Sequence, residues 1–128
     1  MNKIKRKEIS YENFVNGCLS PQTPLFTIST IADIFGKHDH AIYKYVSRFR
    51  DKNIKVCYYM LGSTKNKPMQ YIFCTEDIGL WIYRSTKRGH PLPEDEGNYF
   101  PDNIDYGKIG MDALNKHPEK LKEFFNRL

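Results

Sequence analysis

Five hydrogen-bonding or cationic side chains recur at helical spacing near the middle of the chain: His40, Tyr43, Lys44, Ser47 and Arg48. At about 100° per residue the first four follow one outward line of a helix together with Asp51, and Arg48 and Arg50 flank that line. The opposite face carries an apolar stripe formed by Ala41, Ile42, Tyr45, Val46 and Phe49. Lysine and arginine donate to guanine O6 and N7 or to phosphates, and the other three contact base edges or backbone oxygens. The pattern therefore favours a helix that reads nucleic acid over an ordinary solvated helix face.

The segments around this helix predict how it is held. Ser29 is expected to cap a short helix from Thr30 to Gly36, and Gly36 to Asp39 form a turn, with Asp39 as the cap of the second helix. Two β-branched and aromatic runs follow, Ile54–Leu61 and Gln70–Cys74. Helix, turn, helix and a two-stranded wing are the order of a winged helix-turn-helix, so the expected class is α+β.

Two further groups are candidates for phosphate contact. Lys65 and Lys67 lie in the loop GSTKNKPM between the two strands, where they either touch the DNA backbone or only keep a hairpin tip soluble. Ser29 and Thr30 begin a helix, where free backbone amides and the helix dipole favour an anion. Capping alone also explains Ser29, so its role stays open at this point.

Other chemistries find little support. The triplet His38-Asp39-His40 suggests a metal, but only distant cysteines or His90 would complete a zinc site, and a turn explains the triplet more simply. Three scattered cysteines form no CxxC pair. There is no P-loop, nucleophile elbow or pair of catalytic carboxylates, so we expect neither an enzyme nor a cofactor.

The flanking regions complete the expected organisation. Residues 1–25 are predicted to be a basic arm and a short N-terminal helix over Tyr11–Leu19, and 26–88 the winged helix-turn-helix. A third helix, capped by Thr75, runs from Glu76 to about Thr86. Residues 89–103 are expected to be an acidic linker, and 104–128 a C-terminal helical extension with segments at about 105–115 and 119–128.

Charge is divided unevenly along the 128 residues. Up to Pro93 there are 15 Lys and Arg against 7 Asp and Glu, a net of +8, and from Glu94 onward 5 against 8, a net of −3. A basic body fits an anionic partner, and the acidic tail is a candidate mask for it. No apolar run is long enough for a membrane span or a signal peptide, so the expected location is the cytoplasm.

The stretch from Ile28 to about Ser85 resembles the Rha family of phage regulatory proteins. The resemblance rests on TISTIADIFGKHDHAIYKYV and on KPMQYIFCTEDIGLWI, and residues beyond Pro93 have no counterpart in it. It implies a phage- or prophage-type DNA-binding regulator that acts in the host cell cytoplasm. The expected partner is double-stranded DNA.

Two associations are expected beyond DNA. One helix reads only a few base pairs, so we expect a homodimer, formed through Leu121, Phe124 and Phe125 of the last helix. The rival hypothesis is a phage-encoded inhibitor that binds a host protein through the same scaffold and its acidic tail. Exposed Tyr99, Phe100 and Tyr106 would suit that role.

Overall fold

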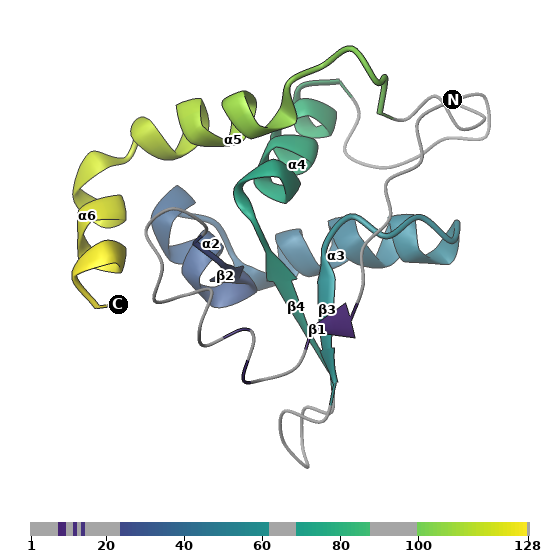
Figure 1. Cartoon of the computed structure of the whole chain (residues 1–128), viewed down its shortest axis with the longest axis horizontal. Helices are drawn as coiled ribbons and strands as arrows, with labels where there is room; N and C mark the ends of the chain where they lie inside the picture. The colour runs from purple at the N-terminus through teal and green to yellow at the C-terminus, as the bar shows by residue number, and fades with distance from the viewer. Residues whose placement is uncertain are drawn as a thin grey trace.

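The computed structural model describes residues 8–9, 12, 14, 24–61, 69–87 and 100–127, which contain a small sheet and five helices (Figure 1). The α+β class is confirmed. The elements are β1 (Glu8–Ile9), β2 (Phe26–Thr27), α2 (Ile28–Phe35), α3 (Asp39–Asp51), β3 (Tyr58–Leu61), β4 (Met69–Phe73), α4 (Thr75–Lys87), α5 (Tyr106–Asn115) and α6 (Pro118–Asn126).

Helices α2 and α3 form the expected pair, but both expected caps are wrong. Thr27 precedes α2 and its hydroxyl accepts from the Thr30 amide, so α2 begins earlier than expected and Ser29 lies inside it. Gly36 ends α2 in the left-handed conformation, at φ 64°, which glycine adopts without a steric penalty. His38 rather than Asp39 is the N-cap of α3, and its side chain makes no capping bond.

The apolar stripe of α3 lies in the core. Four of its five expected members, Ile42, Tyr45, Val46 and Phe49, are buried, whereas Ala41 at the edge of the stripe is exposed. Asn53 then adopts a left-handed conformation at φ 61°, and the next amide bonds back to the Phe49 carbonyl. This is a common way to end a helix, so the direction in which the chain leaves α3 is set locally.

The sheet has four strands in the order β1-β3-β4-β2. Strands β3 and β4 form an antiparallel hairpin that pairs Tyr58 with Ile72 and Leu61 with Met69. Strand β3 begins four residues later than the predicted run Ile54–Leu61, and β4 has the predicted length but lies one residue earlier than Gln70–Cys74. The two-residue strands β1 and β2 were not predicted; β1 pairs in parallel with β3, and β2 in antiparallel with β4. Part of the expected N-terminal arm is therefore a sheet edge.

Side chains of β4 alternate between two apolar clusters. Tyr71 and Phe73 join the main core beneath the helices, while Ile72 joins a smaller cluster with Leu25, against which Phe14 packs. This alternation follows from the two-residue period of a strand. Apart from Glu12 and Phe14, which are helical, the expected helix over residues 11–19 lies outside the described residues.

Helix α4 starts one residue earlier than predicted, and Asp77 rather than the expected Thr75 supplies a capping bond at its start. Thr75 is the first helical residue, and the Asp77 carboxylate accepts from the backbone amide of Cys74 at 3.0 Å and from its thiol at 3.2 Å. A side chain at the third helical position that reaches back in this way is half of a capping box. Asp77 is fully buried, so this bond belongs to the core.

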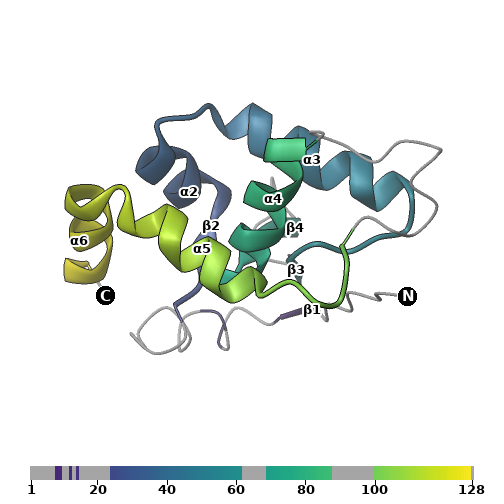
Figure 2. The ribbon, with the colours of Figure 1, turned by 90° about the horizontal axis from the view of Figure 1, so that it is seen from above.

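Helices α5 and α6 confirm the predicted C-terminal segments, with Pro118 in the first turn of α6. They do not form a separate appendage. Helix α5 crosses α4, and a Cβ atom added at Gly79 or Gly110 would collide with the backbone of Tyr106 or Thr75 on the facing helix. Figure 2 shows this crossing, and α6 beside α2.

The end of the expected acidic linker is also part of the core. Phe100 is 3% exposed and lies 5.2 Å from the ring of Phe49, measured between centroids. Tyr106 is buried as well, and its hydroxyl donates to the Pro101 carbonyl at 2.7 Å. Neither aromatic is available to a partner in the way the rival hypothesis requires, and Tyr99 lies outside the described residues.

Candidate nucleic-acid interface

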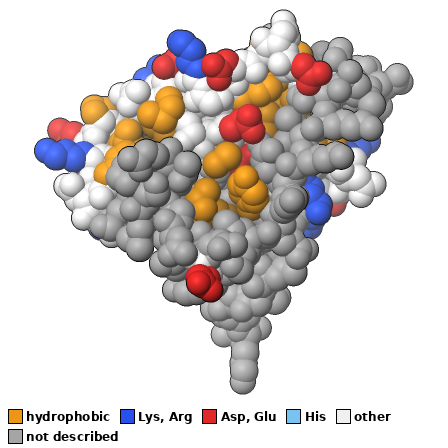
Figure 3. Space-filling view, viewed as in Figure 1, with side chains coloured by type: hydrophobic (Ala, Val, Ile, Leu, Met, Phe, Trp, Pro, Cys, Tyr) orange, Lys and Arg blue, Asp and Glu red, His pale blue; other side chains and the backbone are white. Residues whose placement is uncertain are grey.

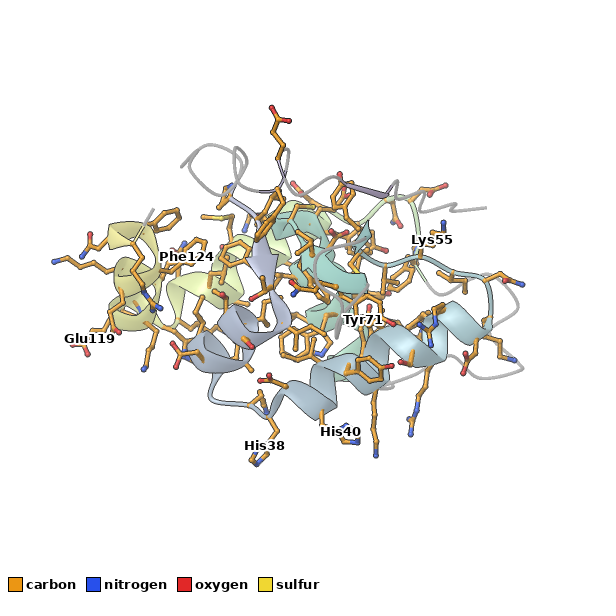
Figure 4. All side chains as sticks on the ribbon, turned by 90° about the horizontal axis from the view of Figure 1, so that it is seen from below. His38, His40, Lys55, Tyr71, Glu119 and Phe124 are labelled. Atoms are coloured by element: carbon orange, nitrogen blue, oxygen red, sulfur yellow. The ribbon has the colours of Figure 1, made fainter. Side chains whose placement is uncertain are left out.

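The outward line of α3 is open to solvent. His40, Tyr43, Lys44 and Arg48 are all exposed, Tyr43 to 46%. Figure 4 shows His38 and His40 pointing away from the molecule where α3 begins. Four of the five residues expected on this face are therefore accessible together, on the helix that follows the turn.

Ser47 is the exception. Its hydroxyl oxygen is buried, so in this conformation Ser47 does not reach the base edges or backbone oxygens that it was expected to contact. The cause is the hairpin, because Tyr71 of β4 lies against this side of α3 (Figure 4). Helical geometry alone puts Ser47 outward, and only the packing of another element covers it.

Tyr71 also joins α3 to the hairpin through Arg50. Arg50 Nη1 donates to the Tyr71 hydroxyl at 2.6 Å, and the rings of Tyr43 and Tyr71 lie 5.5 Å apart. Burial raises the pKa of Tyr71, and the nearby Arg50 charge partly opposes that change. The Tyr71 hydroxyl therefore stays protonated near neutral pH. The Tyr43 side chain packs against the Tyr71 ring on the hairpin side of α3.

The other side of α3 borders a groove of about 500 Å³, which sequence analysis did not predict. Its walls come from the end of α2, the turn, α3 and α4. The lining residues are Phe35, Lys37, Ala41, Lys44, Tyr45, Arg48, Trp81, Ile82 and Ser85. Two of the five predicted reading residues, Lys44 and Arg48, thus belong to both the outward line and the groove.

The start of α2 does not offer the expected phosphate site. The Thr30 amide donates to Thr27 at 3.2 Å, and the two threonine hydroxyls are 3.1 Å apart. Ser29 is exposed, but its hydroxyl donates to the Asp39 carboxylate at 3.2 Å. These groups tie α2 to its own cap and to α3, and an anion would have to displace those bonds.

The remaining predicted sites divide into two groups. Lys65 and Lys67 lie outside the described residues. Leu121 and Phe124, expected at a dimer interface, are each only 8% exposed, and Phe124 stacks on Phe26 at 4.6 Å between centroids. Phe125 is partly buried against the same core, so this face of α6 is covered within one chain and is not a dimer interface in this conformation.

Metal and membrane features are not found in the described part of the chain. No group of three or more His, Cys, Asp or Glu side chains there could hold a metal ion, so the His38-Asp39-His40 triplet gains no further ligand. Among the helices listed above, none is both long and apolar enough to cross a bilayer.

Lysine and arginine side chains away from α3 are more scattered, and some of them are paired with carboxylates. On the face drawn in Figure 3, hydrophobic side chains gather near the middle while Lys and Arg side chains lie apart toward the rim. Two of the C-terminal lysines are paired with carboxylates, Lys108 with Asp112 at 3.2 Å and Lys120 with Asp33 at 3.4 Å. By contrast, Lys44 and Arg48 make no side-chain ion pair or hydrogen bond within the described chain.

Comparison with known proteins adds no assignment. A scan against models of protein families, a search of curated proteins and a search of solved structures each found no match to this chain.

Proposed function

We propose that this chain is a winged helix-turn-helix protein that binds double-stranded DNA with α3 in the major groove and acts as a regulator. The observation that carries the proposal is the exposed row of His40, Tyr43, Lys44 and Arg48 on the second of two helices joined by a short turn. The outward line holds no carboxylate before Asp51, at the end of α3. Such a row suits the phosphate-lined walls of a major groove.

The topology supports this proposal. The elements β2, α2, α3, β3 and β4 follow one another, and β4 pairs with both β2 and β3. A helix pair followed by a hairpin that packs beside the second helix fits a recognition helix with a wing. The Rha-family resemblance covers the same part of the chain and implies the same kind of protein, in the cytoplasm of a phage host.

The two cations would have separate tasks. Arg48 is suited to a bidentate bond with guanine O6 and N7, and Lys44 to either a base or a phosphate. Tyr43 and His40 flank them and would contact bases or backbone oxygens. Most of the affinity would come from charge, so it should fall steeply as salt is added.

A second copy remains part of the proposal, but the surface that joins the copies is not the apolar face of α6. One helix reads only a few base pairs, and paired half-sites are the usual solution. Any dimer must therefore use other residues or form on the DNA itself.

A gel-shift titration tests the proposal. The variant Lys44→Ala/Arg48→Ala should bind mixed genomic duplex fragments at least about tenfold more weakly and reduce the salt slope by about 2. The control is Lys116→Ala/Lys122→Ala, which removes the same charge from exposed positions of the C-terminal helices. Equal binding by the two variants, or no retardation by the unaltered protein at low salt, would reject the proposal.

A further inference from the structure

We propose that the groove between α3 and α4 binds a short acidic peptide segment of a partner protein, with one aromatic or branched apolar side chain inserted between the helices. The site combines an apolar floor with a cationic rim. At about 500 Å³ the groove is within the usual size of a ligand site and holds one or two large side chains.

The floor is the part that calls for an apolar group. Phe35, Tyr45, Trp81 and Ile82 all line it, and the rings of Phe35 and Trp81 meet edge to face at 5.3 Å between centroids. Rings held in this way make the floor rigid, so it loses little conformational entropy when a side chain packs on it. Tyr45 is already buried and Trp81 is only 8% exposed, whereas Phe35 and Ile82 are half-buried. An aromatic or leucine-like anchor would cover the part of this apolar surface that remains in water.

The rim determines the charge of the partner. Lys37, Lys44 and Arg48 stand around the groove, and its lining contains no carboxylate. Within the described chain none of the three side chains is engaged in an ion pair or a hydrogen bond. Carboxylates on either side of the anchor would meet all three cations without displacing an existing partner, which gives charge complementarity.

Duplex DNA fits this groove less well than a peptide does. Phosphates would use the three cations but leave the aromatic floor uncovered, because the sugar–phosphate backbone of a duplex carries no aromatic or branched apolar side chain to pack on it. An acidic peptide with an anchor uses both features at once. The groove therefore favours a protein segment, whereas the outward line of α3 favours DNA.

A regulatory consequence follows, and this part alone rests on the proposed DNA binding. Lys44 and Arg48 belong both to the groove rim and to the outward line of α3. A peptide seated in the groove would neutralise them, so the peptide and DNA should compete. Binding of the partner would then dissociate this protein from DNA.

The test uses the full chain and its single tryptophan, Trp81, which lies in the groove wall. The probe is a capped peptide of sequence EEDFLEE, titrated without DNA while Trp81 emission is followed. Two control peptides separate the contributions: EEDSSEE keeps the charge without the anchor, and QQNFLQQ keeps the anchor without the charge. We expect a saturable change with EEDFLEE only, and at least about tenfold weaker binding of either control.

Variants then localise the binding. Ser85→Glu places a carboxylate in the groove from α4, and Ala41→Phe fills the groove from α3; both positions are exposed, so the fold should tolerate them. Each should weaken EEDFLEE at least about tenfold. Asn126→Glu, at the end of α6, adds the same charge outside the groove and should leave the affinity unchanged.

Several outcomes would overturn the proposal. The first is that EEDFLEE gives no saturable change in Trp81 emission. The second is that the protein binds EEDSSEE as tightly as EEDFLEE. The third is that both groove variants keep the wild-type circular dichroism spectrum and the wild-type affinity for EEDFLEE. A short duplex that gives the Trp81 change while the peptide does not would assign the groove to DNA instead.

The two proposals fail separately. Peptide binding without any DNA retardation would reject the regulator and keep the groove, and DNA retardation without peptide binding would do the reverse. If both bind, addition of EEDFLEE should release duplex DNA in the gel-shift assay. Unchanged retardation at saturating peptide would reject the competition.

Discussion

Two tyrosines near the proposed interface differ in how their hydroxyl groups are hydrogen-bonded. The Tyr45 hydroxyl is buried without a hydrogen-bond partner within the described chain, whereas the Tyr71 hydroxyl accepts from Arg50. Burial, followed by the nearby Asp77 charge, raises the pKa of Tyr45 well above its usual value. Tyr45 therefore serves mainly through its ring, which packs on Phe49 and lines the groove.

The two tyrosines should respond in opposite ways to loss of the hydroxyl. Tyr45→Phe removes a buried polar group that has no partner, so we expect an unchanged or higher free energy of unfolding, by up to about 1 kcal/mol. Tyr71→Phe breaks the 2.6 Å bond from Arg50 and should cost about 1–2 kcal/mol. Urea unfolding of both variants at neutral pH measures the difference. Destabilisation of Tyr45→Phe beyond that of Tyr71→Phe would contradict this account of the core.

Tyr106 makes stability sensitive to alkaline pH. Burial, with Tyr83 and nearby carboxylates, raises its pKa from 10.0 to about 12. Below pH 10 the Tyr106 hydroxyl is protonated in both the folded and the unfolded chain, so its contribution to the free energy of unfolding does not change with pH. As pH rises from about 10 to about 12 only the unfolded chain releases it, and the free energy of unfolding falls by up to about 3 kcal/mol.

The variant Tyr106→Phe isolates that effect. It loses the bond to the Pro101 carbonyl and should be about 1 kcal/mol less stable at neutral pH. Between about pH 10 and pH 11.5 its stability should then decline less than that of the unaltered chain, because one titrating group is gone. Chemical denaturation at both pH values gives the two slopes, and parallel slopes would show that Tyr106 does not titrate as described.

Residue positions were predictable where helical period alone decided them. The period placed Ile42, Val46 and Phe49 inside and His40, Lys44 and Arg48 outside. It failed for Ser47, because the hairpin covers that side of α3. It also failed for Phe100, since a lone aromatic among prolines, glycines and acids has no periodicity that marks it as core.

At the scale of elements, length decides what the sequence can reveal. Helices α3, α4, α5 and α6 span nine or more residues and were predicted within a few residues of their ends. Strands β1 and β2 have two residues each, which is too short for a two-residue period to be recognised. Caps shifted because Thr27, Ser29, Asp39, Thr75 and Asp77 all have side chains that suit a helix start.

The groove was missed for a related reason. Its lining comes from α2, the turn, α3 and α4, and no local pattern connects Lys37 with Ser85. The only signals were the single tryptophan at position 81 and the extra lysine in the turn. Neither residue indicates a groove until the structure brings α4 next to α3.

The crossing of α4 and α5 depends on two glycines and gives a matched set of substitutions. Gly79→Ala and Gly110→Ala would each push a Cβ atom into the facing backbone, so each should lower stability by about 3 kcal/mol or more. At Gly107 the added carbon meets only the Asp105 side chain at 3.5 Å. Gly107→Ala should therefore stabilise α5 by about 0.5–1 kcal/mol, through helix propensity.

Thermal unfolding of the three variants checks this prediction. The expected order of melting temperatures is Gly107→Ala highest, the unaltered chain next, and the two crossing variants lowest. If Gly79→Ala or Gly110→Ala melted like the unaltered chain, α5 would not pack on α4 at this distance.

At the scale of the whole molecule, residues 100–127 are part of the fold. Phe100, Leu114, Leu121 and Phe124 belong to the same core cluster as α2 and α3. Deletion of the tail would therefore remove core side chains and cannot serve as a simple test of masking. Residues 100–128 also hold five Lys and Arg against five Asp and Glu, so the net −3 beyond Pro93 comes from Glu94, Asp95 and Glu96.

Masking of the α3 face must consequently be tested at those three carboxylates. The variant Glu94→Gln/Asp95→Asn/Glu96→Gln raises the net charge from +5 to +8 and leaves the described members of the core cluster unaltered; residues 94–96 lie outside the described residues. If the acidic segment lowers the potential at α3, this variant should bind duplex DNA about three- to tenfold more tightly at low salt. The gain should largely vanish at high salt, where exposed charges are screened over about 3 Å.

A control of equal net charge separates local masking from overall charge. Asp112→Asn/Glu119→Gln/Glu123→Gln also gives +8, but at exposed positions of α5 and α6 (Glu119 is labelled in Figure 4). Local masking predicts a larger low-salt gain for the 94–96 variant than for this control. Equal gains would mean that only total charge matters, and the acidic segment would then have no special relation to the α3 face.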